Sequence, residues 1–284
     1  MGWKTEMTVL IDNVAAEPLA AEWGLSILIT VGERKILLDT GAGPLFAQNA
    51  ERLGIDLADV DLGVLSHAHY DHADGMETFF ALNRKAPFLV REGSCENCWG
   101  IKDGMPHYIG IRSGILEYNN ARIRYVRGVC EIDSGIWLVP HRLADYSSIA
   151  LRNELFTVRN GERCPDDFAH EQSLVVETEL GLVVFNSCSH TGLTNILADI
   201  RELLGWRSIF AYVGGLHLYR QTDEELAVLC DEIRSSSIGH IFTGHCTGDH
   251  AFRFLQAELG DQITQFSSGS AYRFMKALDA DRMC

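Results

Sequence analysis

Four potential metal ligands follow a short apolar run in the first quarter of the chain. The run is Leu62-Gly63-Val64-Leu65, and the ligands after it are His67, His69, Asp71 and His72. Because side chains alternate along an extended backbone, His67 and His69 are expected to point to the same side. Imidazole and carboxylate groups together bind zinc, iron or manganese. One site needs three or four such groups, so the cluster predicts a metal site with capacity for two ions.

Strand patterns and helix patterns alternate along most of the chain. Gly32-Glu33-Arg34 lies between two apolar runs and indicates a hairpin. Between residues 84 and 170 the periodicity weakens. Residues 27–41 and 174–187 are alike, because each reads as strand, turn, strand and polar tip. Residues 8–12 form a short apolar run, and residues 123–126 form a strand-like run. The expected strands span 27–31, 35–39, 62–65, 174–177, 182–185, 208–213 and 238–243, and the expected helices span 44–53, 73–82, 193–204, 223–235 and 251–259.

Three further motifs follow predicted strands in the same way as the first. They are Leu37-Leu38-Asp39-Thr40-Gly41, Cys188-Ser189-His190 and Thr243-Gly244-His245-Cys246-Thr247-Gly248. With the His-x-His-x-Asp-His element, these motifs stand in the order found in the metallo-β-lactamase superfamily, which the chain resembles over about residues 5 to 270. The resemblance implies an α/β fold, a four-layer αββα sandwich with metals at one edge between the sheets.

The resemblance also implies one domain over residues 1–284. The segment at about 84–170 is then an elaboration that covers or shapes the site. Substrate specificity is expected there, because loops on a rigid scaffold often carry recognition. An aromatic substrate ring would need aromatic walls, and the segment offers Trp99, Tyr108, Trp137 and Tyr146, which more often serve in packing.

The resemblance and the spacing imply two divalent metal ions, with zinc the first expectation and iron or manganese as alternatives. The implied ligands are His67, His69 and His190 for the first ion, and Asp71, His72 and His245 for the second. Asp39 is predicted to accept an N–H from a ligand imidazole and so fix its orientation. The alternative is that Asp39 caps the turn before Gly41.

One departure from the superfamily pattern concerns the ligand that bridges the two ions. Most members place an aspartate at the end of the strand between the last two histidine motifs. Here the strand at 209–213 runs into Gly214-Gly215-Leu216-His217-Leu218. His217 is predicted to lie at the site, as a metal ligand, a substrate contact or a catalytic group. Alternatively, His217 is a structural histidine and the second metal site is weak.

The motifs around His190, His217 and His245, together with His170-Glu171-Gln172-Ser173-Leu174, look like a subgroup named after a dihydropterin synthase. That enzyme type joins a dihydropterinylmethyl group to a ribosylated aniline phosphate. By this resemblance His170 is a candidate substrate contact. The alternative for His170 is a polar cap on the strand that starts at Ser173.

The first functional expectation is a metal-dependent hydrolase acting on a small molecule, with Asp71 holding the nucleophile and receiving a proton. The alternative is a transferase of the pterin type just described, in which the metals clamp a diphosphate leaving group. A third hypothesis is a metal-dependent sensor or binding protein without turnover. The four motifs are compatible with all three functions.

Charge and cysteine usage restrict the partners and the compartment. A formal net charge of −15 argues against nucleic acid. No apolar run approaches the ~20 residues that span a bilayer, and residues 1–6 do not read as a signal peptide. The eight cysteines are scattered, which favours a reducing cytoplasm. Cys95 and Cys98 form one close pair, which is expected to be two free thiols rather than a zinc or redox site. The oligomeric state is left open.

Overall fold

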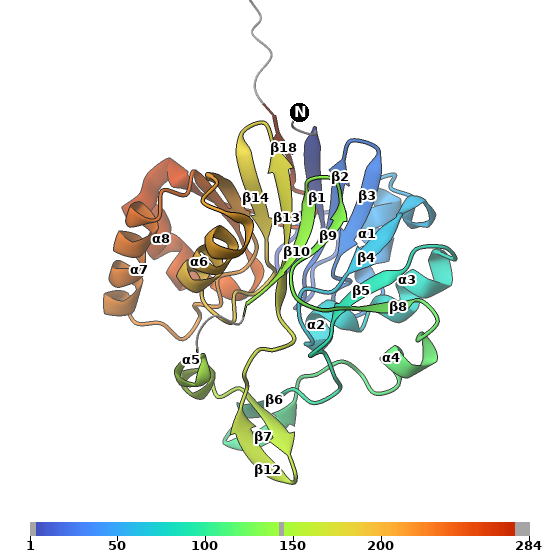
Figure 1. Ribbon diagram of the computed structural model, residues 1–284, viewed down its shortest axis with the longest axis horizontal. Coiled ribbons are helices and arrows are strands. Elements are labelled where there is room, and N and C mark those ends of the chain that lie inside the picture. Colours follow the sequence, from blue (N-terminus) through green and yellow to red (C-terminus); the bar gives the residue numbers. More distant parts are fainter. Residues whose placement is uncertain (1–3, 142–144, 276–284) are drawn as a thin grey trace, which may run out of the picture.

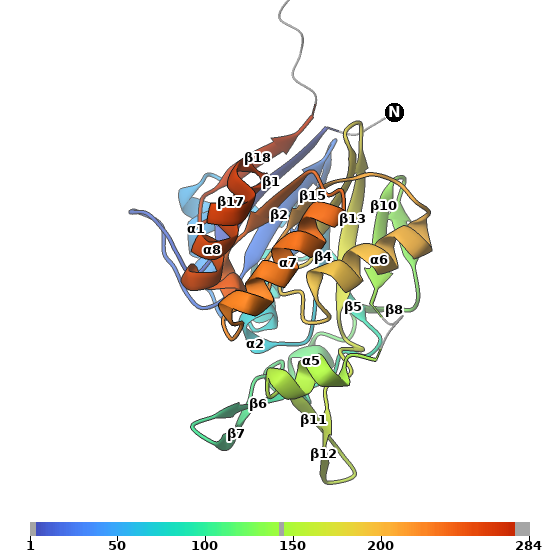
Figure 2. The ribbon, with the colours of Figure 1, turned by 90° about the vertical axis from the view of Figure 1, so that its left-hand side faces the viewer.

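The computed structural model describes residues 4–141 and 145–275. Two sheets stand face to face in its centre, and helices cover the outer face of each sheet (Figure 1). Viewed from the side, α6, α7 and α8 lie together over one sheet (Figure 2). This arrangement is the four-layer αββα sandwich, so the predicted fold class is confirmed.

The first sheet contains seven strands. Its antiparallel part carries the N-terminal hairpin, and its parallel part runs from β3 to β8. The strand order is β18 (Ala271–Phe274), β1 (Thr5–Ile11), β2 (Ser26–Val31), β3 (Arg34–Leu38), β4 (Leu62–Val64), β5 (Phe88–Arg91) and β8 (Ile123–Val126). The helices along this half of the chain are α1 (Leu45–Arg52), α2 (Tyr70–Ala73), α3 (Met76–Leu82) and α4 (Ile115–Tyr118), with the 3₁₀ turn η1 (Leu57–Asp59).

The second sheet also contains seven strands, and β14 to β17 are parallel. The strand order is β17 (Ile263–Gln265), β16 (His240–Thr243), β15 (Ile209–Val213), β14 (Gly181–Phe185), β13 (Gln172–Thr178), β10 (Ile136–Pro140) and β9 (Cys130–Asp133). Its helices are α6 (Leu193–Leu204), α7 (Asp223–Ser235) and α8 (Asp249–Leu259), with the 3₁₀ turns η2 (His245–Thr247) and η3 (Gly260–Gln262).

Three apolar layers hold the sandwich together. The central layer lies between the sheets and takes side chains from both, including Ile27, Val64, Leu174 and Phe185. The outer layers pack helices on each sheet, as α6, α7 and α8 do on the second. Successive side chains of a strand therefore point to two faces that are both buried. This is why several strands read as nearly continuous apolar runs.

The segment 84–170 is only partly the elaboration that the sequence predicts. Its strands β5 and β8 belong to the first sheet, and β9 and β10 belong to the second. The remainder forms a separate four-stranded sheet, in the order β12 (Glu162–Pro165), β11 (Phe156–Arg159), β6 (Trp99–Lys102) and β7 (Met105–Tyr108), with the helix α5 (Ser147–Arg152) beside it. The strands of this segment are short and separated by glycine-rich turns. The apolar periodicity of the sequence therefore does not reveal that they belong to different sheets.

The helix expected at 73–82 is two helices instead. α2 begins at Tyr70, and the chain breaks at Asp74 and Gly75 before α3 starts. At Gly75 a Cβ would lie 2.0 Å from the carbonyl oxygen of Thr40. The break therefore lets the backbone pass close to the strand end that carries Asp39.

The C-terminal strand β18 pairs with β1, and this pairing buries Phe274 inside the molecule while Arg273 stays exposed. The rest of the C-terminal run, from 276 to 278, lies outside the described residues. No helix within 4–141 and 145–275 has the length and apolar character needed to cross a membrane.

Candidate metal centre

The histidines of the sequence motifs gather where strands of both sheets end. His67, His69 and His72 follow β4, His190 follows β14, and His245 follows β16. The carboxyl ends of parallel strands share one edge of a sheet, and the two sheets bring their edges together here. Residues separated by more than a hundred positions in the chain thus become neighbours.

The first group consists of His67, His69 and His190, whose ligand atoms all lie within 4.8 Å of one another. The ring centroids are 4.6 Å apart for His67 and His69, and 4.7 Å for His67 and His190. The Nε2 atoms of His67 and His69 and both ring nitrogens of His190 are buried without a hydrogen-bond partner. An unpaired buried nitrogen is costly, and a metal ion would satisfy these atoms.

The second group consists of Asp71, His72 and His245. The Nε2 atoms of His72 and His245 lie 3.1 Å apart. Asp71 Oδ2 is 3.5 Å from His245 Nε2 and 3.8 Å from His72 Nε2. Two nitrogens bound to one tetrahedral zinc ion would be about 3.3 Å apart, given Zn–N bonds near 2.0–2.1 Å. Both groups therefore fit divalent ions, and the structure brings the six predicted ligands together as two adjacent sets.

Protein groups orient the ligand imidazoles from behind. Asp39 Oδ2 lies 2.8 Å from His72 Nδ1. Ser66 Oγ lies 2.8 Å from His67 Nδ1, and Asn13 Oδ1 lies 3.0 Å from His245 Nδ1. Each of these contacts leaves Nε2 free to face the site. The structure thus places Asp39 against the imidazole of His72, one of the predicted ligands.

Burial controls protonation in the two groups. It lowers the pKa of His67, His69, His190 and His245 well below the ordinary value for histidine. Neutral imidazole is the form that binds metal. At His72 burial also lowers the pKa, but the carboxylates of Asp71 and Asp39 outweigh it and raise the pKa.

His217 lies beside the first group. Its ring centroid is 4.3 Å from that of His190, and both of its ring nitrogens are buried without a partner. Its φ of 51° lies in the left-handed region, which is strained for a residue with a side chain. Such strain persists where surrounding structure enforces it, often at functional sites. The structure therefore places His217 beside His190, and its role there stays a prediction.

His170 does not occupy the position expected of a substrate contact. The Ala68 backbone N–H donates to its Nδ1 at 3.2 Å, and its Nε2 lies 3.2 Å from Asp166 Oδ2. Both ring nitrogens are therefore used by the protein, and the side chain is buried behind His69. Nor does His170 cap β13, whose first residue Gln172 donates its backbone N–H to Ser66. His170 instead holds the backbone between His67 and His69.

Sequence reasoning missed several residues that the fold brings to the centre. Glu171 is buried, and its carboxylate accepts the backbone N–H groups of His190 and Thr191 at 2.9 and 3.0 Å. Cys188 and Cys246 lie beside the second group, with their sulfurs 3.3 Å apart. The positions of the two cysteines in the sequence could have indicated that they lie at the centre, because Cys188 precedes His190 by two residues and Cys246 directly follows His245.

A cleft of about 470 Å³ opens onto both groups. Its aromatic lining is Trp23, Tyr70 and Tyr219, while the separate hairpin sheet contributes Ile101, Lys102 and His107. Trp23 lies 5.2 Å from His245, measured between ring centroids. The separate four-stranded sheet thus lines part of the cleft through residues of β6 and β7.

The four aromatic residues predicted to wall the site do not line this cleft. Trp99 and Tyr108 pack on each other with centroids 5.1 Å apart. Trp137 packs beneath Arg207, and Tyr146 is buried and donates its hydroxyl to Asp199. These rings contact other parts of the protein, and the sequence does not reveal those partners.

The pair Cys95 and Cys98 forms no disulfide, so both are free thiols. Cys95 is exposed, whereas Cys98 is buried in a group with His69, Asp166 and His170. Of the two thiols, only Cys95 is on the surface.

Comparison with known proteins tests the resemblance carried by the motifs. The model of the metallo-β-lactamase superfamily matches residues 24–148. Together with the fold and the relatives described next, this match confirms the resemblance to the metallo-β-lactamase superfamily.

Two full-length relatives from Methanocaldococcus jannaschii are similar to this chain. One is 7,8-dihydropterin-6-methyl-4-(β-D-ribofuranosyl)-aminobenzene-5′-phosphate synthase, 25% identical over 274 residues that cover 90% of this chain and 92% of the relative. The other is the uncharacterized protein MJ0448, 27% identical over 245 residues that cover 84% and 90%. Among solved structures, Tm1679, described as a metal-dependent hydrolase of the β-lactamase superfamily, superposes with a TM-score of 0.80. It is 29% identical, and the match covers 96% of this chain and 100% of that chain.

Proposed function

We propose that this protein is a metal-dependent hydrolase that uses two divalent ions to cleave a small-molecule substrate. One observation carries the proposal. Three buried imidazoles with unpaired nitrogens converge on one point, and a carboxylate with two more imidazoles converges beside it. Both groups face a cleft large enough for a small molecule.

The chain's own residues divide the work. Bound divalent ions would polarise the substrate and lower the pKa of water, with zinc the first choice for this donor set and iron or manganese as alternatives. Asp71 lines the cleft, where its carboxylate would hold the nucleophile and receive a proton. Trp23 and Tyr219 supply apolar walls against which a substrate could pack.

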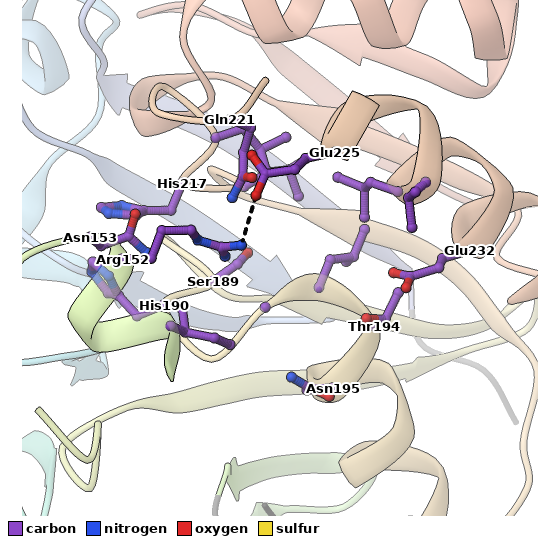
Figure 3. Close-up of a pocket in the computed structure, with 17 residues that line it drawn as sticks. Arg152, Asn153, Ser189, His190, Thr194, Asn195, His217, Gln221, Glu225 and Glu232 are labelled. Atoms are coloured by element: carbon purple, nitrogen blue, oxygen red, sulfur yellow. Dashed lines mark hydrogen bonds and ion pairs between the residues drawn. The ribbon is translucent and has the colours of Figure 1, made fainter. Parts of the chain in front are cut away.

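A second candidate function is the transfer of a dihydropterinylmethyl group to a ribosylated aniline phosphate. The synthase relative supports it, because that match covers 90% of this chain. A second cavity, of about 290 Å³, adjoins the first, and His190 and His217 line both. Two substrates could therefore meet at these histidines. Figure 3 shows His190 and His217 on one side of this second cavity and Glu232 on the opposite side.

The charge and the cysteines of the chain support a class of substrate and a cellular compartment for this enzyme. A net charge of −15 disfavours nucleic acid as the substrate, and the free thiols suit the reducing cytoplasm. We therefore propose a small molecule as the partner.

The first test is metal content per chain, measured by elemental analysis on protein purified without added metal or chelator. Two equivalents are expected in the wild type. His67→Ala should lose metal, whereas His250→Ala, at an exposed histidine paired with Asp223, should keep it. A wild-type protein without metal would contradict the proposal.

The second test separates the hydrolase from the transferase in one reaction. The metal-loaded protein is incubated with a dihydropterinylmethyl diphosphate in ¹⁸O-labelled water, with and without a ribosylated aniline phosphate. Hydrolysis needs no acceptor, and it puts ¹⁸O into the pterin alcohol when the C–O bond breaks or into the released phosphate or diphosphate when a P–O bond breaks. Transfer gives a coupled product without label and requires the acceptor. A set of phosphodiesters, lactones and thioesters extends the assay, and a metal-loaded protein without turnover on any of these compounds would count against both functions.

A further inference from the structure

Cys188 lies between the two groups of the metal centre. It follows β14 and is buried, with 3% of its surface exposed. Its Sγ is 3.2 Å from His72 Nε2. A nitrogen and a sulfur bound to one tetrahedral zinc ion would be about 3.5 Å apart, given Zn–N near 2.0 Å and Zn–S near 2.3 Å. The sulfur therefore stands at ligand distance from a predicted ligand of the second group.

The same sulfur also reaches the first group. Cys188 belongs to three sets of ligand atoms that each lie within 4.8 Å of one another: with His67 and His72, with His190 and His217, and with His245 and Cys246. These sets include histidines of both groups. A ligand at this place could contact two ions at once.

Charge gives a physical reason for a thiolate at this position. Two divalent ions bring four positive charges into a buried site, and neutral imidazoles offset none of them. Of the six predicted ligands, Asp71 alone carries a negative charge. Burying uncompensated charge is costly, so another anionic ligand stabilises the loaded site. Thiolate is a strong ligand for zinc and for other late transition metals.

We propose that Cys188 is a metal ligand whose thiolate lies between the two ions and occupies the bridging position. This inference rests on the metal-dependent function proposed above. On binding, the Cys188 S–H bond breaks, its proton passes to solvent, and sulfur–metal bonds form. No oxidant or reductant is required. Two metal ions bound here would therefore be held by five imidazoles, one carboxylate and one thiolate.

Cys246 has a different role from Cys188. It is buried too, and its thiol donates toward Cys188 Sγ over 3.3 Å. Among the three sets of ligand atoms named above, Cys246 belongs only to the set with Cys188 and His245. We assign Cys246 as a positioning residue that orients the sulfur of Cys188. Gly215 makes room for it, since a Cβ there would lie 2.5 Å from Cys246 Sγ.

The test uses full-length protein loaded with Co²⁺, because thiolate-bound cobalt has a near-ultraviolet charge-transfer band that imidazole and carboxylate ligands lack. The wild type should show this band. Cys188→Ser should bind cobalt with lower affinity and lose the band, while Cys246→Ser should retain it. Cys230→Ser is the matched control, because Cys230 is also buried but packs in the apolar layer between helices and sheet.

The outcomes separate this inference from the proposed function. Cobalt bound without the band in the wild type would overturn the inference and leave the metal site standing. Absence of bound cobalt would overturn both. A band lost in Cys246→Ser and kept in Cys188→Ser would overturn the assignment of Cys188.

X-ray absorption on the wild-type zinc protein provides a reading that needs no variant, in case Cys188→Ser fails to fold. A sulfur scatterer near 2.3 Å from zinc is expected if the thiolate is a ligand. A zinc shell made only of nitrogen and oxygen would contradict the proposal.

Discussion

Asp39 Oδ2 lies 2.8 Å from His72 Nδ1, and both side chains are fully buried. The same carboxylate also accepts the backbone N–H and the hydroxyl of Ser66 at 2.7 and 2.6 Å. Since a carboxylate only accepts hydrogen bonds, His72 carries a proton on Nδ1 and turns Nε2 toward the metal centre. Asp39 thus links the first sheet to the chemistry of the second group.

Replacing this carboxylate should weaken metal binding. In Asp39→Asn one side-chain oxygen becomes an NH₂ group, which cannot accept from both Ser66 and His72. We expect metal affinity to fall by about 10- to 100-fold, the usual cost of losing such a supporting contact. The measurement is chelator competition followed by metal analysis. Asp133→Asn, at an exposed aspartate paired with Arg34, is the control and should bind as the wild type does. An unchanged affinity in Asp39→Asn would show that His72 is oriented without it.

Glu171 should matter for stability although it touches no predicted ligand atom. Its two oxygens accept the backbone N–H groups of His190 and Thr191. In Glu171→Gln the NH₂ group faces one of these donors, which leaves a buried hydrogen bond unmade at a cost of about 1–3 kcal/mol. Urea unfolding of metal-free protein should show this loss. Glu177→Gln, at an exposed partner of Arg207, should change the unfolding free energy by less than about 0.5 kcal/mol. Equal effects at the two positions would refute this account of Glu171.

Gly75 should resist replacement by alanine because an added side chain has no room. Its φ of −69° suits any residue, so the backbone conformation by itself does not require glycine. An added Cβ, however, would lie 2.0 Å from Thr40 O and 2.8 Å from Gly43 O, which are backbone atoms. Overpacking of this kind costs about 1–3 kcal/mol or more, and alanine is also a poor residue at the N-cap of a helix, the position that Gly75 holds in α3.

The matched variant for this prediction is Gly43→Ala, where a Cβ would meet nothing within 4 Å. Thermal unfolding should show a clear loss of stability for Gly75→Ala and little change for Gly43→Ala. A Gly75→Ala protein as stable as the wild type would mean that the backbone of the first turn of α3 can move away from the strand end.

His240 should contribute to the loss of stability in weak acid. Burial lowers its pKa in the folded protein, with Asp261 opposing the shift in part. As the pH falls below about 6.5, the unfolded chain takes up a proton at this histidine before the folded protein does. The unfolding free energy therefore decreases with falling pH in this window, until the pH passes the folded pKa.

His240→Gln should remove this contribution while keeping a donor for Thr264 Oγ1, which His240 Nε2 contacts at 2.9 Å. Because the side chain is partly exposed, the effect is expected to be less than about 1 kcal/mol. Denaturant unfolding at pH 7.5 and pH 5.5 provides the comparison. A variant with a steeper decrease than the wild type would reverse the predicted sign.

The sequence by itself determined the local parts of this protein. Alternating apolar residues predicted β2 and β3, and a period near 3.6 residues predicted α6 and α7 with their bounds, because both patterns are set by neighbours in the chain. The spacing of His67 and His69 marked the metal centre for the same reason. The order of the four motifs then supported the superfamily and its αββα sandwich.

Only the tertiary structure decided which distant groups meet. Cys188 contacts His72 across 116 positions, and His170 binds the backbone of Ala68 across 102. No local period encodes such contacts, since they depend on how two sheets close on each other. The same closure turned His170 away from the cleft, placed Trp23 and Tyr219 in it, and divided the segment 84–170 between three sheets. Spacing along the chain fixed which residues could bind a metal, and the packing of the sheets decided which of them face one another.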